Sequence, residues 1–361
     1  MELTKRFLFT WLTALTLVAG LTQSQAQASC KQTLKLIGSS TQAAVNVREL
    51  KEIKTMRVMA FNVNNLFTSE VERVGPKPPQ VKSEFEIKRL RDIIQETNPD
   101  FAVFTEVASK ASLDKISKGY PKTEYESYLI QGNDPRGINI GFAVKKDLPF
   151  HIEQISHKHV MWYDHITKKD VPLFSRDLPV LLFRTEANAK PFLILFGNHA
   201  KSQRNRKGDP LSSKWRTAQF KGAAKIVEQF KQKFGDVPMI FAGDHNTNVM
   251  HSNEIAPLWP HFVDSFNAAP DTLAPGPDRT TFTYHPLVRW RPKKEGVAIW
   301  NQLDAILFSK GFANSLKSAK IYRYKDALGN VLRLPESFKE RGLNPSDHYP
   351  IFVDFFTDKL F

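Results

Sequence analysis

The sequence predicts an α/β fold in which two β-sheets pack face to face and helices cover them. Three observations support this prediction. Short apolar segments of strand length recur along the chain, only two long segments have the apolar period of a helix, and no repeat or linker divides the chain. A doubly wound parallel sheet would require a helix after most strands, so we expect two packed sheets instead.

The first predicted elements are a strand at 56–63 and a helix at 83–97. The strand residues alternate between apolar and polar, as in a half-buried strand. Ser83 and Glu86 have the spacing of a capping box, and the apolar residues after them recur on one helix face. Pro99 then ends the helix.

The remaining elements follow in order along the chain. Apolar runs predict strands at 101–104, 138–144, 178–184, 192–197, 238–242, 302–308 and 350–356. A second amphipathic helix is predicted at 213–233. Pro, Gly and charged residues predict long irregular loops at 68–82, 145–176, 200–212 and 247–300. Loops of this length often carry binding residues, although passive surface insertions have the same composition.

The composition is that of a folded, strongly basic protein. The chain has 361 residues, 41% of them hydrophobic and 24% charged, which excludes a mainly disordered chain. Its formal net charge is +14 at pH 7. Such a charge attracts polyanions, which include nucleic acids, anionic lipids and cell-surface polymers.

The N-terminus has the pattern of an export signal. A basic start, an uncharged apolar run and a small-x-small ending identify 1–28 as a signal peptide, too short for the roughly 20 apolar residues of a membrane span. We therefore expect a secreted or periplasmic protein without a membrane span. Cys30 is the only cysteine, and Gln27 disfavours a lipid anchor on it. A flexible segment at 29–55 and one domain at 56–361 would follow.

Polar residues of the types found in hydrolytic sites lie at or near the ends of several predicted strands. Each alone would usually be a turn residue or a solvated one. Strand ends in packed sheets lie along one edge, so together these side chains can meet in one cleft. They are Asn62, Glu106, His199, Asp244, Asn246, Asp304, Asp347 and His348.

The motifs around these residues resemble the endonuclease/exonuclease/phosphatase superfamily, which includes deoxyribonuclease-like enzymes, sphingomyelinases and inositol-polyphosphate phosphatases. They are Ala60-Phe61-Asn62-Val63-Asn64, Phe104-Thr105-Glu106-Val107, Gly197-Asn198-His199, Gly243-Asp244-His245-Asn246, Gln302-Leu303-Asp304-Ala305-Ile306 and Ser346-Asp347-His348-Tyr349-Pro350. The resemblance implies a four-layered α/β sandwich, with two mixed sheets flanked by helices. It also implies metal-dependent hydrolysis of phosphate esters.

The predicted metal site consists of Asn62, Glu106 and Asp347. Mg²⁺ is the expected ion because it prefers oxygen ligands and needs only one or two carboxylates, with Mn²⁺ or Ca²⁺ as alternatives. Asn64 stands where some relatives carry Asp, which removes one negative charge from this site. Whether one or two ions act stays open.

The predicted catalytic residues are His199, Asp244, Asn246, Asp304 and His348. His348 would hold or take the proton of the attacking water if a carboxylate orients its other ring nitrogen, and the resemblance implies Asp304 for that task. Members of the family divide the role of base differently between the residues matching Asp244 and His348, so both stay candidates. His199 would hydrogen-bond the phosphate or protonate the leaving oxygen.

The predicted substrate-binding residues are Asn139, Arg176, Lys201 and Arg204. Arg176 lies in a segment that resembles the arginine segment of the deoxyribonuclease branch. Lys201 and Arg204 belong to a basic loop after His199. A second basic and aromatic loop is expected at 281–294, although charge runs of this kind are often only solvated surface.

We predict an exported endonuclease that hydrolyses DNA or RNA with low sequence specificity. Nucleic acid is the expected partner, as substrate, and we expect a monomer without a stable protein partner. One alternative is a lipid phosphodiesterase or phosphatase resembling sphingomyelinase, which should carry an exposed apolar hairpin. The sequence has no compact cluster of that kind, although Trp162-Tyr163 and Leu258-Trp259 could contribute to one. The other is a non-catalytic polyanion-binding protein. The sequence does not separate endonucleolytic from exonucleolytic attack.

Overall fold

The computed structural model describes residues 51–72, 79–121, 123–282, 301–335, 340 and 342–360. These residues all fall within one compact unit. The predicted signal peptide, Cys30 and most of the predicted N-terminal segment lie outside them. Within the described residues, no helix is long and apolar enough to cross a membrane.

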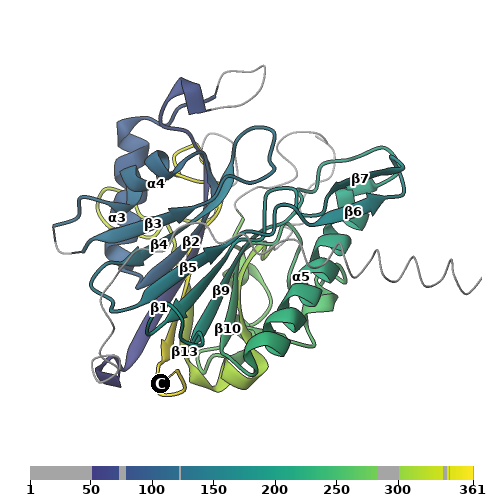
Figure 1. Cartoon of the computed structure of the whole chain (residues 1–361). Helices are drawn as coiled ribbons and strands as arrows, with labels where there is room; N and C mark the ends of the chain where they lie inside the picture. Colours follow the sequence, from purple (N-terminus) through teal and green to yellow (C-terminus); the bar gives the residue numbers. More distant parts are fainter. Residues whose placement is uncertain are drawn as a thin grey trace, which may run out of the picture. The chain divides into compact units, whose positions relative to one another are not determined.

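Two six-stranded sheets form the centre of the fold (Figure 1). The first has the order β13 (Leu316–Ile321), β14 (Ile351–Phe356), β1 (Thr55–Leu66), β2 (Phe101–Val107), β4 (Asn139–Lys145), β3 (Tyr125–Leu129). The second has the order β11 (Phe262–Asp264), β12 (Asp304–Ser309), β10 (Met239–Asp244), β9 (Leu193–His199), β8 (Val180–Arg184), β5 (His151–Ile155).

Both sheets are mixed in the same way. A single parallel pair, β1 with β2 and β9 with β10, occupies the centre of each sheet. All other neighbouring strands in the two sheets are antiparallel. His199 and Asp244 are the last residues of β9 and β10, and they therefore lie side by side at the carboxyl ends of this parallel pair.

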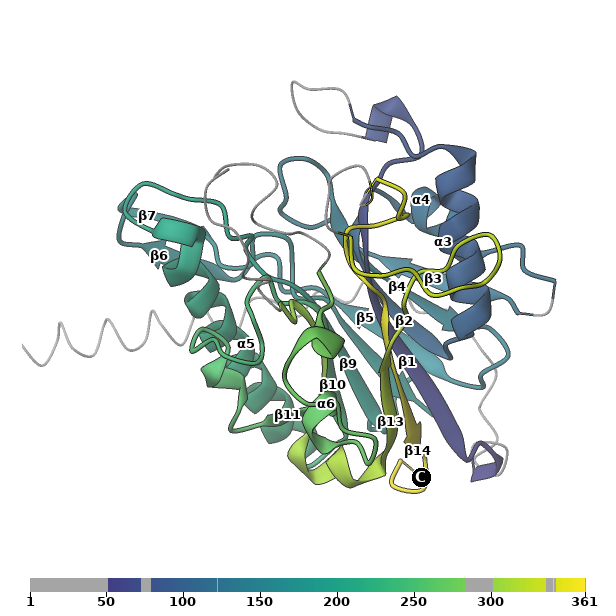
Figure 2. The same ribbon diagram turned by 180° about the vertical axis from the view of Figure 1, so that it is seen from behind.

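Helices cover the outer faces of both sheets, as Figures 1 and 2 show. The first sheet is covered by α3 and α4 and the second by α5. The helices are α3 (Glu84–Thr97), α4 (Lys110–Ser117), α5 (Ser213–Phe234) and α6 (Ser265–Ala268), with short 3₁₀ turns at Glu70–Glu72, Pro210–Ser212, Ala256–Leu258, Pro277–Arg279 and Lys310–Ser315. The predicted four-layered α/β sandwich is confirmed.

Three apolar layers hold the sandwich together. Residues from both sheets, such as Phe142 and Leu195, form the layer between them. Leu90 of α3 packs on the outer face of the first sheet, and Phe230 of α5 packs on the outer face of the second. Each buried aromatic or aliphatic side chain contributes about 1.5–3 kcal/mol of transfer free energy relative to an exposed one.

The first predicted helix begins as the sequence indicates. The Ser83 hydroxyl accepts from the Glu86 amide at 3.2 Å, and the Glu86 carboxylate accepts from the Ser83 amide at 2.9 Å. This reciprocal pair satisfies two amides that no helical carbonyl can reach. The helix ends at Asn98, which has left-handed backbone angles and donates to Ile94.

The prediction of an irregular loop at 145–176 is wrong. This segment contains β5 and a two-stranded hairpin, β6 (Met161–Asp164) and β7 (Lys169–Pro172). β5 has the sequence His-Ile-Glu-Gln-Ile, so it lacks the apolar run of the central strands. As an edge strand it pairs with only one neighbour, β8, and tolerates these polar residues.

Gly197 of β9 allows the two sheets to approach near the edge that carries His199. A Cβ atom at this position would lie 2.8 Å from Ile140 Cγ2 and 2.8 Å from Phe142 Cζ, both in β4 of the opposite sheet. Any larger residue would push the sheets apart. The glycine therefore keeps the strand ends of both sheets within reach of one another.

Candidate active site

Strand register places three of the predicted residues in one row. Asp244 ends β10 and lies opposite His199 of the parallel strand β9. On its other side Asp244 lies opposite Asp304 of the antiparallel strand β12. Side chains directly opposite one another in a sheet point to the same face, so the row is a consequence of the pairing itself.

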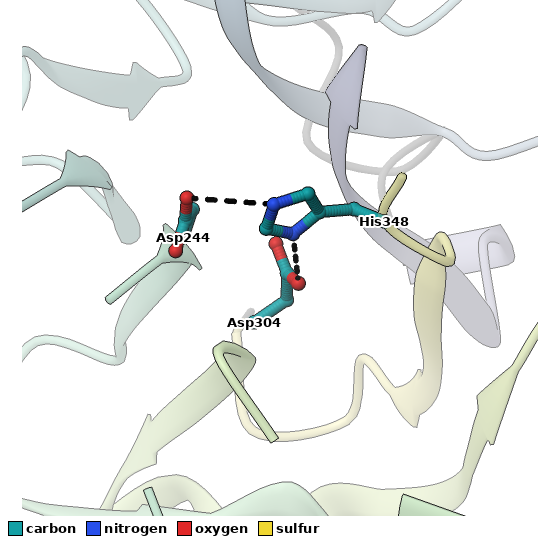
Figure 3. A group of neighbouring side chains, drawn as sticks. All are labelled: Asp244, Asp304 and His348. Carbon is teal, nitrogen blue, oxygen red and sulfur yellow. Dashed lines mark hydrogen bonds and ion pairs between the residues drawn. The ribbon is translucent and has the colours of Figure 1, made fainter. Parts of the chain in front are cut away.

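His348 joins this row from the loop before β14 (Figure 3). Its Nδ1 lies 2.7 Å from Asp304 Oδ2, and its Nε2 lies 4.0 Å from Asp244 Oδ2. Asn62 completes the group, because its Nδ2 donates to Asp244 Oδ2 at 3.1 Å and lies 3.4 Å from His348 Nε2. Both sheets therefore contribute to one buried polar cluster.

Hydrogen bonds to the backbone fix the loop of His348. The Ser346 hydroxyl donates to the Asn62 carbonyl at 2.7 Å and accepts from the His348 amide at 3.1 Å. The Tyr324 hydroxyl donates to the His348 carbonyl. This small Ser-Asp-His turn is thus tied to the end of β1, which sets the imidazole against Asp304.

The position of Asp304 is fixed from the backbone as well. The Thr281 hydroxyl oxygen accepts from the Leu303 and Asp304 amides, each at 2.9 Å. The Phe282 ring lies 4.8 Å from the His348 ring and covers one side of it. Most of the predicted second basic loop, from Thr283 to Lys294, lies outside the described residues.

Burial and nearby charges give Asp244 and His348 different pKa values. Burial raises the pKa of Asp244 to about 7, although His348 acts in the opposite direction. Burial lowers the pKa of His348, but the negative charges of Asp304 and Asp244 outweigh this effect and raise the pKa to about 10. Near neutral pH, His348 therefore carries its proton, while Asp244 is the group that titrates.

His199 lies between the buried cluster and Glu106. Its Nε2 is 3.5 Å from Asp244 Oδ2 and 3.8 Å from Glu106 Oε1. Burial, followed by the positive charges of Arg176 and Arg136, lowers its pKa well below the ordinary value. The ring is therefore neutral and can donate a hydrogen bond from only one nitrogen.

The turn after β10 orients Asp244. The Asn246 amide donates to Asp244 Oδ1 at 2.7 Å, and Asn246 Nδ2 donates to Asp244 Oδ2 at 3.1 Å. Gly243 precedes the carboxylate with a φ of +135°, and a Cβ there would lie 2.1 Å from the Asn198 carbonyl oxygen. Only glycine fits this position, so the Gly-Asp-x-Asn motif has a steric cause.

Glu106 extends into the site from an irregular point in β2. Its φ is 66°, and the pairing of β2 with both neighbours shifts register at this residue. Left-handed backbone in a strand is costly for a residue with a side chain, and such bulges re-aim side chains at functional sites. The carboxylate accepts from the Asn65 amide at 2.9 Å, and its side chain is 17% exposed.

Two sets of residues are candidates for holding a divalent cation. Ligand atoms of Asp244, Asp304 and His348 lie within 4.8 Å of one another, and Asp304 Oδ1 is buried without a hydrogen-bond partner. The protonated His348 opposes a cation there, because a metal needs the neutral imidazole. Glu106, Asn62 and Asp347 offer only oxygen donors that a hard cation prefers.

Asp347 precedes His348 in the loop before β14. It is half-buried, and its negative charge and that of Glu106 both act on the ammonium group of Lys82. That Glu106 and Asp347 bind a metal together stays a prediction.

Two of the predicted substrate-binding residues, Arg176 and Asn139, are buried. Arg176 pairs with Asp134 at 3.1 Å and donates to the Ala200 carbonyl at 3.0 Å. Asn139 accepts from the Gly132 amide and donates to the carbonyls of Ala108 and Gly137, at 2.7–2.9 Å. Their polar groups support neighbouring loops, and their predicted contact with substrate stays a prediction.

Lys201 and Arg204 lie in the loop after β9. The Lys201 ammonium lies 5.3 Å from the centre of the Trp215 ring, whereas Arg204 is exposed. Arg204 lines a cavity of about 310 Å³ together with Lys82 and Arg136. The sequence analysis did not identify Lys82 or Arg136 as site residues, because each belongs to an irregular segment without a motif.

His245 packs as a buried ring in the turn after β10. The ring is fully buried and stacks on Phe241, with centroids 5.7 Å apart and planes at 27°. Asn198 Nδ2 lies 2.7 Å from its Nδ1. Burial lowers the pKa of this imidazole to about 3. The residue thus acts as a neutral aromatic side chain in the interior.

Comparisons with known proteins address the fold. The sequence matches no family model, and no curated protein sequence matches it. The structure is similar to truncated TDP2 from Caenorhabditis elegans, with a TM-score of 0.52 at 19% identity, covering 84% of this chain and 98% of that one.

Two bacterial structures are similar to the same extent. A Bacteroides thetaiotaomicron endonuclease/exonuclease/phosphatase family protein has a TM-score of 0.53 at 15% identity, covering 84% of this chain and 95% of the other. A mannosyl-6-phosphatase from the same species has a TM-score of 0.51 at 16% identity, covering 82% and 98%. The resemblance predicted from the sequence motifs is thus confirmed at the level of structure: the chain has the fold of the endonuclease/exonuclease/phosphatase family.

Proposed function

We propose that the protein is an exported, metal-dependent phosphodiesterase that acts on nucleic acid. The observation that carries this proposal is the buried cluster of Asp244, Asp304 and His348, with Glu106 facing it across His199. Hydrolysis of a phosphodiester needs a proton acceptor for water, a positive charge for the phosphate and a metal site beside them. Asp244, His348 and Glu106 are the proposed candidates for these three tasks.

Asp244 is the proposed proton acceptor. Its raised pKa leaves it partly ionised near neutral pH, where a base is most effective. His348 keeps its proton and is held by Asp304 at 2.7 Å, so it places a fixed positive charge beside the phosphate. The neutral ring of His199 favours a hydrogen bond to the phosphate over protonation of the leaving oxygen.

Glu106, Asn62 and Asp347 would hold Mg²⁺, with Mn²⁺ or Ca²⁺ as alternatives, which would polarise a phosphoryl oxygen and stabilise the developing charge. Glu106 accepts from the Asn65 amide through one oxygen, which leaves the other directed toward His199. Removal of either carboxylate would lower the affinity for the cation.

The charge distribution supports nucleic acid as substrate. The chain has a net charge of +14, and three cationic side chains line the cavity beside Glu106. Cations along a groove follow the phosphates of a strand without reading its sequence. One neighbour is named a mannosyl-6-phosphatase, so a sugar phosphate is a specific alternative to test.

The hairpin β6–β7 does not support a lipid substrate. Met161 is 53% exposed and Tyr163 is 46% exposed, but both lie within β6, away from the tip. The tip at 165–168 has the sequence His-Ile-Thr-Lys, which is polar apart from one residue. A hairpin that inserts into a bilayer would carry apolar residues at its tip.

One experiment tests the proposal and its alternatives. Purified protein is incubated with labelled single- and double-stranded DNA and RNA, sphingomyelin and mannose 6-phosphate, with Mg²⁺ or with a chelator. We expect cleavage of a nucleic acid that the chelator abolishes. Hydrolysis of only the lipid or the sugar phosphate would replace the proposed substrate, and binding without hydrolysis of any ester would contradict catalysis. N-terminal sequencing of protein from the extracellular or periplasmic fraction tests export.

A further inference from the structure

A cationic cavity adjoins the candidate active site, and this inference rests on the proposed function. The cavity has a volume of about 310 Å³. It is lined by Asn64, Asn65, Phe67, Gln80, Lys82, Glu86, Arg136 and Arg204. Its volume lies at the lower end of ligand-binding pockets, which measure roughly 300–1,000 Å³. The question is which chemical group such a lining would bind.

The cavity begins next to Glu106. The Asn65 amide donates to Glu106 Oε2 at 2.9 Å, and Asn65 and Asn64 both form part of the lining. Both asparagines have left-handed backbone angles, with φ of 53° and 51°. This turn directs the chain from the predicted metal ligand into the wall of the cavity, so a group in the cavity would be a near neighbour of one bound at the site.

Three of the eight lining residues, Lys82, Arg136 and Arg204, have cationic side chains. Glu86 is the only carboxylate in this lining. Lys82 is 8% exposed, and its ammonium donates to the Pro345 carbonyl at 3.1 Å. It lies 3.7 Å from the Glu86 carboxylate. Burial of an ammonium group is costly unless anions surround it. The lining has one carboxylate for three cations, so it has an excess of positive charge next to the nearly buried Lys82.

Arg136 is held by an ion pair with Asp134, whereas Arg204 has no ion-pair partner among the described residues. The Arg136 Nε and Nη2 both donate to Asp134 at 3.0 Å, which leaves Nη1 without a hydrogen bond to any described residue. Asp134 also pairs with the buried Arg176, so the acceptor is itself fixed. The Arg204 guanidinium makes no ion pair within the described part of the chain. The planar fork of arginine suits phosphate oxygens.

We propose that this cavity binds a second phosphate group of the substrate, adjacent to the phosphodiester that is cleaved. The three cations supply the charge and the asparagine amides supply neutral donors, a combination that suits a phosphate better than a sugar or a base. The preferred substrate is then a nucleic-acid strand or end with two neighbouring phosphates, rather than an isolated phosphodiester.

The test compares three small substrates that share one cleavable linkage. They are the thymidine dinucleotide TpT, its 5′-phosphorylated form and its 3′-phosphorylated form. We expect one phosphorylated form to be cleaved at the internal linkage with kcat/KM at least about tenfold above that of TpT. Equal kcat/KM for all three substrates would overturn the proposal.

Variants assign the preference to the cavity. Arg204→Gln and Lys82→Met should each reduce the ratio of kcat/KM between the preferred substrate and TpT by several-fold. Lys207→Gln is the matched control, because Lys207 is exposed on the same loop and is not part of the lining. A preference that survives both cavity substitutions would overturn the assignment. Arg204 is exposed, so its variant keeps the test valid if Lys82→Met fails to fold.

A binding measurement separates this proposal from the proposed function. The dissociation constants of the three dinucleotides are measured by calorimetry in the presence of chelator, where no hydrolysis is expected. Tighter binding of one phosphorylated form, lost in Arg204→Gln and kept in Lys207→Gln, supports the cavity even if no dinucleotide is cleaved. Cleavage of all three with equal affinities supports the nuclease and contradicts the cavity.

Discussion

The buried part and the open part of the site are constructed differently. The buried part consists of Asp244, Asp304 and His348, which are nearly inaccessible and lie on or beside paired strands. The open part consists of Glu106 and the cationic cavity, which lie on a bulge and on loops.

This difference indicates a division of tasks. Register in a sheet fixes distances closely, which suits proton transfer, since a misplacement of about 1 Å can cost about 100-fold in rate. Loops vary in length and charge at little cost to the fold, which suits the recognition of substrate. We therefore expect the buried part to determine the reaction and the open part to determine the cation and the substrate.

The largest expected effect comes from His348→Ala, which removes the fixed positive charge of the buried part. We expect kcat for the cleaved nucleic acid to fall by about 100- to 1,000-fold, the range for removal of one fixed group that stabilises developing charge. His159→Ala is the control, because His159 is an exposed histidine outside the buried cluster. A loss of less than about tenfold would show that the buried part does not perform the chemistry.

Glu106→Gln should give a smaller and different loss. The Mg²⁺ concentration for half-maximal activity should rise by about tenfold or more, because one charged ligand is lost. High Mg²⁺ should restore much of this activity, whereas it should not restore His348→Ala. Glu124→Gln, at an exposed salt bridge, is the control. Equal Mg²⁺ dependence of Glu106→Gln and the wild type would remove Glu106 from the metal site.

The pH dependence should report the buried part. Asp244 has a raised pKa of about 7, so its ionised form, and with it kcat/KM, should increase as pH rises through that value. His348 has a raised pKa of about 10, so activity should fall only in the alkaline range as its proton is lost. Asp304→Asn removes the negative charge that raises this pKa most, so the alkaline limb should move to lower pH. An unmoved limb would contradict the role of Asp304.

The smallest expected effect is on stability rather than on chemistry. Gly197→Ala places a Cβ 2.8 Å from Ile140 and Phe142, and we expect the free energy of unfolding to fall by about 1–3 kcal/mol. Gly311→Ala, which meets nothing within 4 Å, is the matched control. Urea unfolding of both variants provides the measurement. Equal stability of the two would show that the sheets do not need this glycine to approach.

The same two parts differ in how far the sequence predicted them. The motifs identified the residues of the buried part because sterics and pairing restrict them, as Gly243 and the register of Asp244 with Asp304 show. The fold was predicted for the same reason, since the central strands β2, β9 and β10 begin with continuous apolar runs. The edge strand β5 was missed because one neighbour imposes little pattern on a strand.

The open part was predicted less completely. Lys82 and Arg136 come from loops that are distant in sequence, and only the folded chain brings them together in one cavity. Arg176 and Asn139 were expected to contact substrate, but the sequence alone does not reveal that their partners are Asp134 and backbone carbonyls. Residue type indicates that a side chain can bind an anion, whereas its burial decides what it contacts.

The position of a bound cation tests the division between the two parts most directly. Crystals of the protein soaked with Mn²⁺ would be measured at the manganese absorption edge, so that anomalous scattering locates the ion. We predict a peak at Glu106 and Asp347, with His348 still hydrogen-bonded to Asp304. A single peak between Asp244, Asp304 and His348 would contradict the account, because the buried part would then hold the metal instead of moving the proton.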